Sequence, residues 1–162
     1  MSVSAEDVFF MNVALAQARA ALDIGEIPVG AVVICGNRVL SAAYNRRLVD
    51  KSPFAHAEML AMQNAADVLQ NWRFDNCTLY VTLEPCPMCA GAVVQTRIAR
   101  VVYGASDPKA GAGGTLYNVL CDPRLSHRCQ VESGVLAEES RALLREYFQN
   151  KRKRTWKTGQ PE

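Results

Sequence analysis

Two features of exported and membrane proteins are missing from this sequence of 162 residues. The longest apolar run, residues 28–35, is far too short to span a bilayer. The N-terminus has neither the basic start nor the apolar core of a secretory signal peptide. Without export, cysteines are expected to stay reduced rather than to form disulfides. We therefore expect a cytoplasmic protein that is not bound to a membrane.

Histidine and aromatic residues are also scarce, with two histidines and an aromatic fraction of 7%. The remaining composition is ordinary for a globular protein, at 49% hydrophobic and 21% charged residues. A chain of this length buries a sufficient core without disulfide support. We expect one domain over residues 1–162.

The sequence has no large excess of charge: 18 basic residues nearly balance 16 acidic ones, and the net charge of +2 favours no class of partner. The distribution is uneven, because seven basic residues and only one acid, Glu146, lie between Arg141 and Lys157. The basic residues are densest at residues 151–154. We predict a basic C-terminal helix or tail over about residues 137–162.

What the sequence does have is six cysteines, two of them in the motif Glu84-Pro-Cys-Pro-Met-Cys89. The motif follows an alternating apolar run at residues 78–83, which predicts a strand, and precedes a helical pattern. Pro87 suits the first position of that helix. Cys86 then caps the helix and Cys89 lies one turn further, so both sulfurs face one side. Thiolates at a helix N-terminus have lowered pKa values and can bind a divalent metal.

The third ligand of such a site is predicted to be His56, within Ala55-His-Ala-Glu58. One histidine and two cysteines leave the fourth tetrahedral position of zinc open for water. We expect His56 in the first turn of a helix, with Glu58 beside the open position. The pattern H-x-E…P-C-x-x-C is typical of zinc deaminases.

Two other interpretations of the cysteine pair are weaker. A thioredoxin-like redox motif would not need the His-x-Glu partner. A structural zinc site would need a fourth protein ligand, and no remaining candidate lies at ligand spacing. These candidates are Cys35, Cys77, Cys121, Cys129 and His127.

The other segments predict an α/β layered fold. Helices are expected at residues 6–24, 55–69, 115–120 and 136–151, with a further helix after Pro87. Strands are expected at residues 29–34, 38–44, 78–83, 99–103 and 128–133. The first two strands form an antiparallel hairpin, and the later strands, joined by helices, are expected to be parallel. Residues 104–114 form a glycine-rich loop without a phosphate-binding pattern.

Over nearly its whole length the sequence resembles the bacterial tRNA-specific adenosine deaminases of the cytidine deaminase-like superfamily. Beyond the zinc motif, the segments that match are residues 26–32, 88–92, 97–98, 102–105 and 107–111 and the aromatic pair Tyr147-Phe148. The resemblance implies a three-layer α-β-α fold with a five-stranded mixed sheet, working as a homodimer. It also implies hydrolysis of adenosine to inosine at the wobble position of an arginine tRNA.

The resemblance assigns roles residue by residue. His56, Cys86 and Cys89 would hold one zinc ion per subunit, and Glu58 would move protons. The residues that would contact the target nucleotide or its neighbour are Asn45, Val29, Ala57 and Asp107.

An RNA substrate would give roles to three aromatic residues and to the basic residues near the C-terminus. Phe54, Tyr147 and Phe148 could stack on bases, although helical aromatics often pack inward. Within residues 151–154, Lys151 and Arg152 are expected to contact the tRNA anticodon stem-loop.

Three positions depart from the commonest form of the family: Phe54, Ser126 and Arg47. They put contacts of the substrate loops in question, not the chemistry. Two other functions stay open at this point. One is a deaminase of free guanine, cytosine or a nucleoside, and the other is a non-enzymatic RNA-binding protein with a structural zinc.

Overall fold

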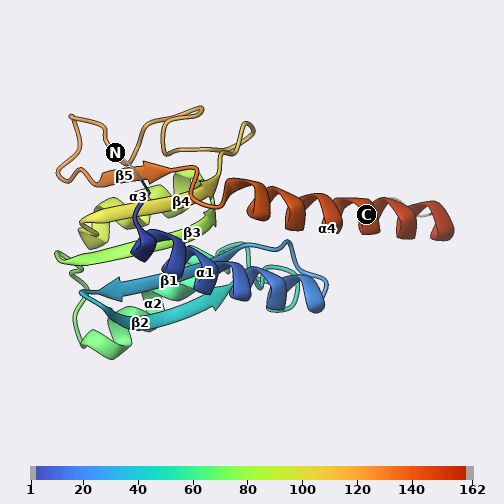
Figure 1. The fold of residues 1–162 in the computed structure, drawn as a ribbon, viewed down its shortest axis with the longest axis horizontal. Helices are drawn as coiled ribbons and strands as arrows, with labels where there is room; N and C mark the ends of the chain where they lie inside the picture. Colours follow the sequence, from blue (N-terminus) through green and yellow to red (C-terminus); the bar gives the residue numbers. More distant parts are fainter. Residues whose placement is uncertain (1–2, 160–162) are drawn as a thin grey trace.

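The structure is a computed structural model that describes residues 3–159, and it consists of one five-stranded sheet with helices on both faces (Figure 1). The strand order is β2-β1-β3-β4-β5. The strands are β1 (Gly30–Cys35), β2 (Arg38–Tyr44), β3 (Cys77–Leu83), β4 (Arg100–Ala105) and β5 (Gln130–Ser133). The helices are α1 (Ala5–Asp23), α2 (Ala57–Leu69), α3 (Pro87–Thr96) and α4 (Ala137–Thr158). The predicted α/β fold with a five-stranded mixed sheet is confirmed.

Four of the five strands point the same way, and β1 alone opposes them. The β1–β2 hairpin is antiparallel, as predicted, while β3–β4 and β4–β5 are parallel pairs. The sequence does not predict that β1 also pairs antiparallel with β3. The chain leaves β2, passes through α2 and returns as β3 on the far side of β1. The parallel strands β2 and β3 are therefore joined by a helix, as expected, without being neighbours.

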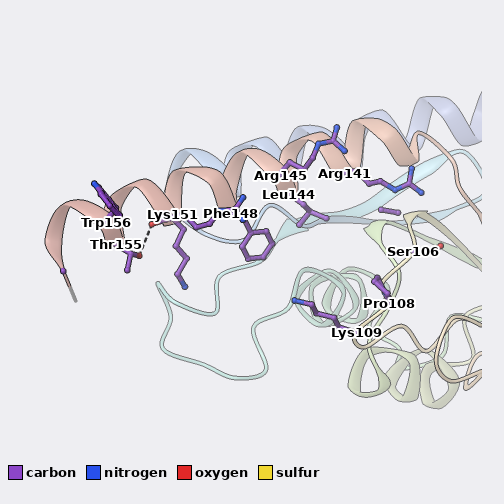
Figure 2. A pocket seen from close by; sticks show the side chains of 13 residues that line it. Ser106, Pro108, Lys109, Arg141, Leu144, Arg145, Phe148, Lys151, Thr155 and Trp156 are labelled. Atoms are coloured by element: carbon purple, nitrogen blue, oxygen red, sulfur yellow. Dashed lines mark hydrogen bonds between the residues drawn. The ribbon is translucent and has the colours of Figure 1, made fainter. Parts of the chain in front are cut away.

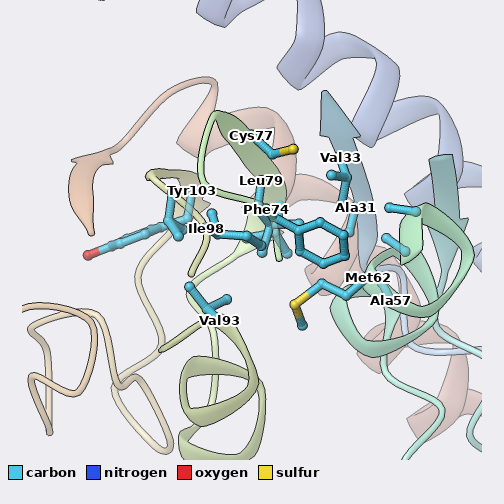
Figure 3. Packing of buried hydrophobic residues seen from close by; sticks show 14 of the residues in the cluster. Ala31, Val33, Ala57, Met62, Phe74, Cys77, Leu79, Val93, Ile98 and Tyr103 are labelled. Atoms are coloured by element: carbon cyan, nitrogen blue, oxygen red, sulfur yellow. The ribbon is translucent and has the colours of Figure 1, made fainter. Parts of the chain in front are cut away.

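The alternation of side chains along the strands divides the core into two layers. Val32, Ile34 and Tyr80 belong to the layer that α1 covers. Val33 and Leu79 belong to the opposite layer, which α2 and α3 cover. Figure 3 shows Met62, Phe74 and Val93 of this second layer close to the sheet. Since both faces are buried, the sheet is the middle layer of three, and the helices that begin at its edge are held in place by packing.

Helices differ from prediction by more than one residue at three places. The helix expected from residue 55 begins at Ala57. The helix expected at residues 115–120 is absent, and a turn closed by a bridge between Gly113 and Asn118 takes its place. The C-terminal helix continues to Thr158, so the basic residues 151–154 are helical, and this half of α4 projects past the sheet (Figure 1). Among the described residues, no helix combines the length and apolarity needed to cross a membrane.

One buried ion pair fastens α1 to the sheet. Both carboxylate oxygens of Asp7 accept hydrogen bonds from the Arg100 guanidinium, at 2.6 and 3.0 Å. The Tyr80 hydroxyl donates a third hydrogen bond to Asp7, at 2.9 Å. The hydrogen bond from Arg100 holds the pKa of Asp7 well below its usual range, against the opposing effect of burial.

Replacing Asp7 with asparagine is expected to lower the free energy of unfolding by about 2 kcal/mol at pH 7, because the Arg100 charge loses its partner. The pKa of Asp7 is lower in the folded than in the unfolded protein, where it is about 3.9. Its stabilisation is therefore complete above that value and is lost as the pH falls below it. Urea unfolding of both proteins at pH 7 and between pH 4 and 3 measures the difference. Equal stability at pH 7 would contradict this role.

Candidate active site

The three predicted metal ligands meet where two helices begin. His56 is the N-cap residue of α2 and Cys86 is the N-cap residue of α3, with Cys89 in the first turn of α3. The His56 Nδ1 atom lies 3.6 Å from the Cys86 sulfur and 3.5 Å from the Cys89 sulfur. The prediction for α3, with Pro87 at its first turn, is confirmed. His56 lies one residue earlier than expected, because it caps α2 instead of entering it.

The donor set fits a zinc ion. The ligand atoms of His56, Cys86 and Cys89 all lie within 4.8 Å of one another, and among residues 3–159 no fourth His, Cys, Asp or Glu joins them. One imidazole and two thiolates are ligands that zinc prefers, and they leave one tetrahedral position open. His127, a candidate for a fourth ligand, instead hydrogen-bonds elsewhere: its Nε2 atom lies 2.6 Å from the Ile98 carbonyl oxygen.

The three residues of the ligand cluster shift one another's pKa values. The hydrogen bond with Cys89 and, to a smaller extent, the one with His56 lower the pKa of Cys86 to about 4, against the opposing effect of burial. The hydrogen bond with Cys86 also raises the pKa of His56. The hydrogen bond to Cys86 and burial raise the pKa of Cys89. Binding of a metal cation would require both cysteines to be in the thiolate form.

Glu58, the second residue of α2, lines a cavity of about 160 Å³ together with His56 and Cys86. Only 4% of its surface is exposed. Burial raises the pKa of its carboxyl group to about 7. A carboxyl group with this pKa can both accept and release a proton near neutral pH, which is the property of a general acid–base.

The walls of this cavity contain every residue expected to contact the target nucleotide or its neighbour: Val29, Asn45, Ala57 and Asp107. Sequence reasoning missed four further lining residues, Ile27, Leu83, Glu84 and Ala110, although each lies in or beside a segment that carries the resemblance. Arg47, noted as a departure from the family, also lines the cavity.

The side chain of Asn45 is held by its neighbours. Its amide nitrogen donates to the Glu26 carboxylate and to the Ile27 carbonyl, both at 3.3 Å. Its side-chain oxygen accepts from the Arg47 N–H at 3.3 Å. Both amide hydrogens are therefore used inside the protein, and the second lone pair of the oxygen is left for a ligand.

A second and larger cavity, of about 1190 Å³, runs along α4 (Figure 2). It contains the three C-terminal residues predicted to contact RNA: Phe148, Lys151 and Arg152. In Figure 2, Phe148 and Lys151 project from α4 toward the side on which Pro108 and Lys109 lie. The remaining basic residues of the lining are Arg141 and Arg145.

One loop, residues 105–110, contributes to both cavities. Asp107 and Ala110 line the cavity at Glu58, while Ser106, Pro108 and Lys109 line the cavity along α4. The two cavities therefore lie on opposite sides of one short segment.

The other two aromatic candidates line neither cavity. Tyr147 is buried and cannot stack on a ligand, whereas Phe54 is 65% exposed.

Comparison with known proteins identifies relatives along most of the chain. Residues 5–152 match the family model of the MafB19-like deaminases. The chain is 46% identical over 149 residues to the tRNA-specific adenosine deaminase of Bacillus subtilis, covering 92% of each protein. It is 47% identical over 147 residues to the protein of that name from Haemophilus influenzae, covering 90% of this chain and 85% of the relative.

Two solved structures are similar in fold. One comes from a study of A-to-I editing by tRNA:A34 deaminases at the wobble position of transfer RNA. It has a TM-score of 0.81 and 40% identity, and covers 84% of this chain and 99% of the other. The guanine deaminase from Nitrosomonas europaea has a TM-score of 0.76 and 26% identity, and covers 91% of this chain and 86% of the other.

Proposed function

This chain belongs to the family of tRNA-specific adenosine deaminases, and we propose that its substrate is the wobble adenosine of an arginine tRNA. The reaction replaces the amino group at C6 of adenine with oxygen from water, giving inosine and ammonia. The observation that carries the proposal is a buried glutamate beside a His-Cys-Cys cluster in a cavity lined by the expected nucleoside-contacting residues. The whole chain, residues 1–162, is proposed to be one cytoplasmic deaminase domain.

His56, Cys86 and Cys89 would hold one zinc ion per subunit. A zinc ion with one open position lowers the pKa of a coordinated water to about 7 and so makes a nucleophile available at neutral pH. The N-terminus of α3, where both cysteines lie, favours the thiolate form of Cys86. Measurement of zinc content in the purified protein tests this part of the proposal, with one ion per chain expected.

Glu58 would carry the protons of the reaction. Its carboxylate takes a proton from the water molecule that adds at C6 of adenine. It delivers that proton to N1, where negative charge develops. It then takes the remaining proton from the hydroxyl group on C6 and gives it to the amino group, which leaves as ammonia while the C6 carbonyl forms. Its burial supports this role, because it brings the pKa close to the pH at which both transfers occur.

The target base would enter the cavity from a single-stranded anticodon loop. Such a base is already unpaired, so its extraction costs less than flipping from a duplex. Val29 and Ala57 would form the walls of the base site. The side-chain oxygen of Asn45 would accept a hydrogen bond from the nucleoside, and Asp107 would lie near the ribose of a neighbouring nucleotide.

The cavity along α4 would receive the rest of the anticodon stem-loop. Its basic side chains suit phosphates, and Phe148, 47% exposed, suits an unstacked base. The loop at residues 105–110 joins this surface to the cavity at Glu58.

Replacing residues 151–154 together by glutamine is expected to weaken binding of anticodon stem-loops about equally for different loop sequences. It should also flatten the salt dependence, because each lost phosphate contact on a single strand removes roughly 0.7 from the log–log slope. Affinity titrations at several salt concentrations measure both effects. In a matched pair of single replacements, Arg152→Gln should reduce the slope, whereas replacement of Arg38, an exposed arginine at the start of β2, by glutamine should not. An unchanged slope in the fourfold variant would contradict the RNA role of α4.

We also propose that the chain forms a homodimer, as the resemblance implies. Exposed apolar side chains such as Leu116 and Tyr117, 52% and 57% exposed, provide surface for such contact. Light scattering over a range of protein concentrations tests the oligomeric state.

The substrate proposal is tested by assaying an arginine tRNA and free guanine side by side. Free guanine is the alternative substrate to compare, because a guanine deaminase is similar to this chain in fold. We expect the protein to release ammonia from the tRNA and not from guanine. Release with guanine alone would assign the cavity to a free base.

A further inference from the structure

Glu84 is buried and takes no part in the proposed proton transfers, but it closely contacts the glycine-rich loop that carries Asp107. Glu84 is the first residue after β3, two residues before the zinc ligand Cys86, and is 2% exposed. Its side chain is directed at residues 107–115 and helps to line the active-site cavity. A buried carboxylate is unfavourable unless hydrogen bonds compensate its loss of water.

Four donors from this loop provide that compensation. One carboxylate oxygen of Glu84 accepts from the Asp107 N–H at 2.9 Å and from the Thr115 hydroxyl. The other oxygen accepts from the N–H groups of Gly113 and Thr115, both at 3.0 Å. Hydrogen bonds to a charged acceptor are stronger than neutral ones. The loop is therefore wrapped around the carboxylate of Glu84.

The glycines of the loop make this approach possible. A Cβ atom at Gly111 would fall on the Glu84 carboxylate itself. A Cβ atom at Gly113 would lie 2.9 Å from the Tyr103 ring and 3.4 Å from the Glu84 side chain. The nearness of Glu84 thus explains the glycine at position 111, and together with Tyr103 it explains the glycine at position 113.

We propose that Glu84 is a positioning residue: by binding both ends of the loop at residues 107–115, it sets the place of Asp107 at the active-site cavity and so controls nucleotide binding. It acts through the loop and does not touch the reacting atoms. The proposal rests on the proposed tRNA substrate for its effect on catalysis, but its structural part can be measured without any substrate.

The protein also contains a matched control. Glu26 is fully buried and holds the other cavity loop, accepting from the Val49 N–H at 2.7 Å and from the Asn45 amide at 3.3 Å. Glu84→Gln and Glu26→Gln are therefore the same chemical change at two buried carboxylates. Each places an amide N–H₂ against a group that now donates a hydrogen bond to the carboxylate, but the two act on different loops.

Hydrogen–deuterium exchange of the zinc-loaded protein, without RNA, tests the structural part. Glu84→Gln should speed exchange of residues 105–116 by roughly tenfold or more, leaving residues 45–50 unchanged, while Glu26→Gln should do the reverse. If Glu84→Gln does not fold, Thr115→Val, which removes only the hydroxyl donor, must show the same local change at smaller amplitude. Unchanged exchange at residues 105–116 in the variant that folds would overturn the proposal.

Steady-state kinetics on an anticodon stem-loop test the functional part. Glu84→Gln should raise KM by roughly tenfold while kcat changes by less than about threefold, the pattern expected when binding rather than the chemical step is weakened. A fall in kcat at unchanged KM, with full zinc content, would overturn the positioning role. Absence of activity in the wild-type protein would instead overturn the proposed substrate, and the exchange result would still stand.

Discussion

Replacing Glu58 with alanine is expected to lower kcat by roughly 10³-fold, within the range typical of a lost general acid–base. Among the described residues, the buried acids that line this cavity are Glu58 and Glu84. The carboxylate of Glu84 accepts hydrogen bonds from the glycine-rich loop, which leaves the carboxylate of Glu58 to transfer protons. Zinc content should stay at one ion per chain, because His56, Cys86 and Cys89 are unchanged. Single-turnover kinetics and metal analysis by mass spectrometry measure the two quantities.

A glutamine at the same position is the matched control for shape. Glu58→Gln preserves the size of the side chain and its packing in α2, but it cannot accept the proton of the attacking water. It should be as inactive as the alanine variant while it unfolds at the same denaturant concentration as the wild type. Substantial turnover by either variant would mean that another group transfers the protons.

Replacing Cys86 with alanine is expected to have the second large effect, loss of the metal and of activity together. Removal of a partner that only orients a metal ligand costs roughly 10–100-fold in affinity, so loss of a ligand should exceed about 100-fold. Stability should also fall, because metal binding contributes to the free energy of folding. Zinc content after dialysis and thermal unfolding with and without added zinc measure these effects.

Cys35 is the matched control for a general effect of cysteine loss. It is half-buried like Cys86 but lies at the end of β1, outside the ligand cluster. Cys35→Ala should retain zinc and turnover. Full zinc occupancy in Cys86→Ala would show that the ligands are wrongly assigned.

The meeting of His56, Cys86 and Cys89 beside Glu58 could be predicted from the sequence because each half of the cluster is a short motif. Cys86 and Cys89 lie one helical turn apart, and Pro87 marks where that turn begins. The placement of His56 in the first turn of α2 is wrong by one residue. An N-cap residue has extended backbone angles, and no pattern in the sequence separates these from the first helical position here.

The loops around the cavity could not be predicted in the same way. Glycine-rich composition indicates a loop but not what it wraps around, and Glu84 lies far from Gly113 in the sequence. The predicted helix at residues 115–120 fails for the same reason, because Thr115 is held by Glu84 through both its N–H and its hydroxyl. The internal use of the Asn45 amide by Glu26 is likewise a contact between distant segments.

Sheet order was also beyond the reach of local patterns. Each strand was predicted within two residues of its observed bounds, since alternation of apolar residues depends only on neighbours. The insertion of β1 between β2 and β3 depends on which strands meet after α2 crosses the sheet. In this sheet order the start of α2 lies beside the start of α3, so that His56 meets Cys86.

Sequencing of an arginine tRNA after incubation with the zinc-loaded protein tests the central claim most directly. The tRNA should carry unmodified adenosine at the wobble position, and reverse transcription reads inosine as guanosine. The account predicts conversion at that position alone, and no conversion with Glu58→Ala under the same conditions. An unconverted wobble adenosine, together with turnover of free guanine by the same preparation, would contradict it.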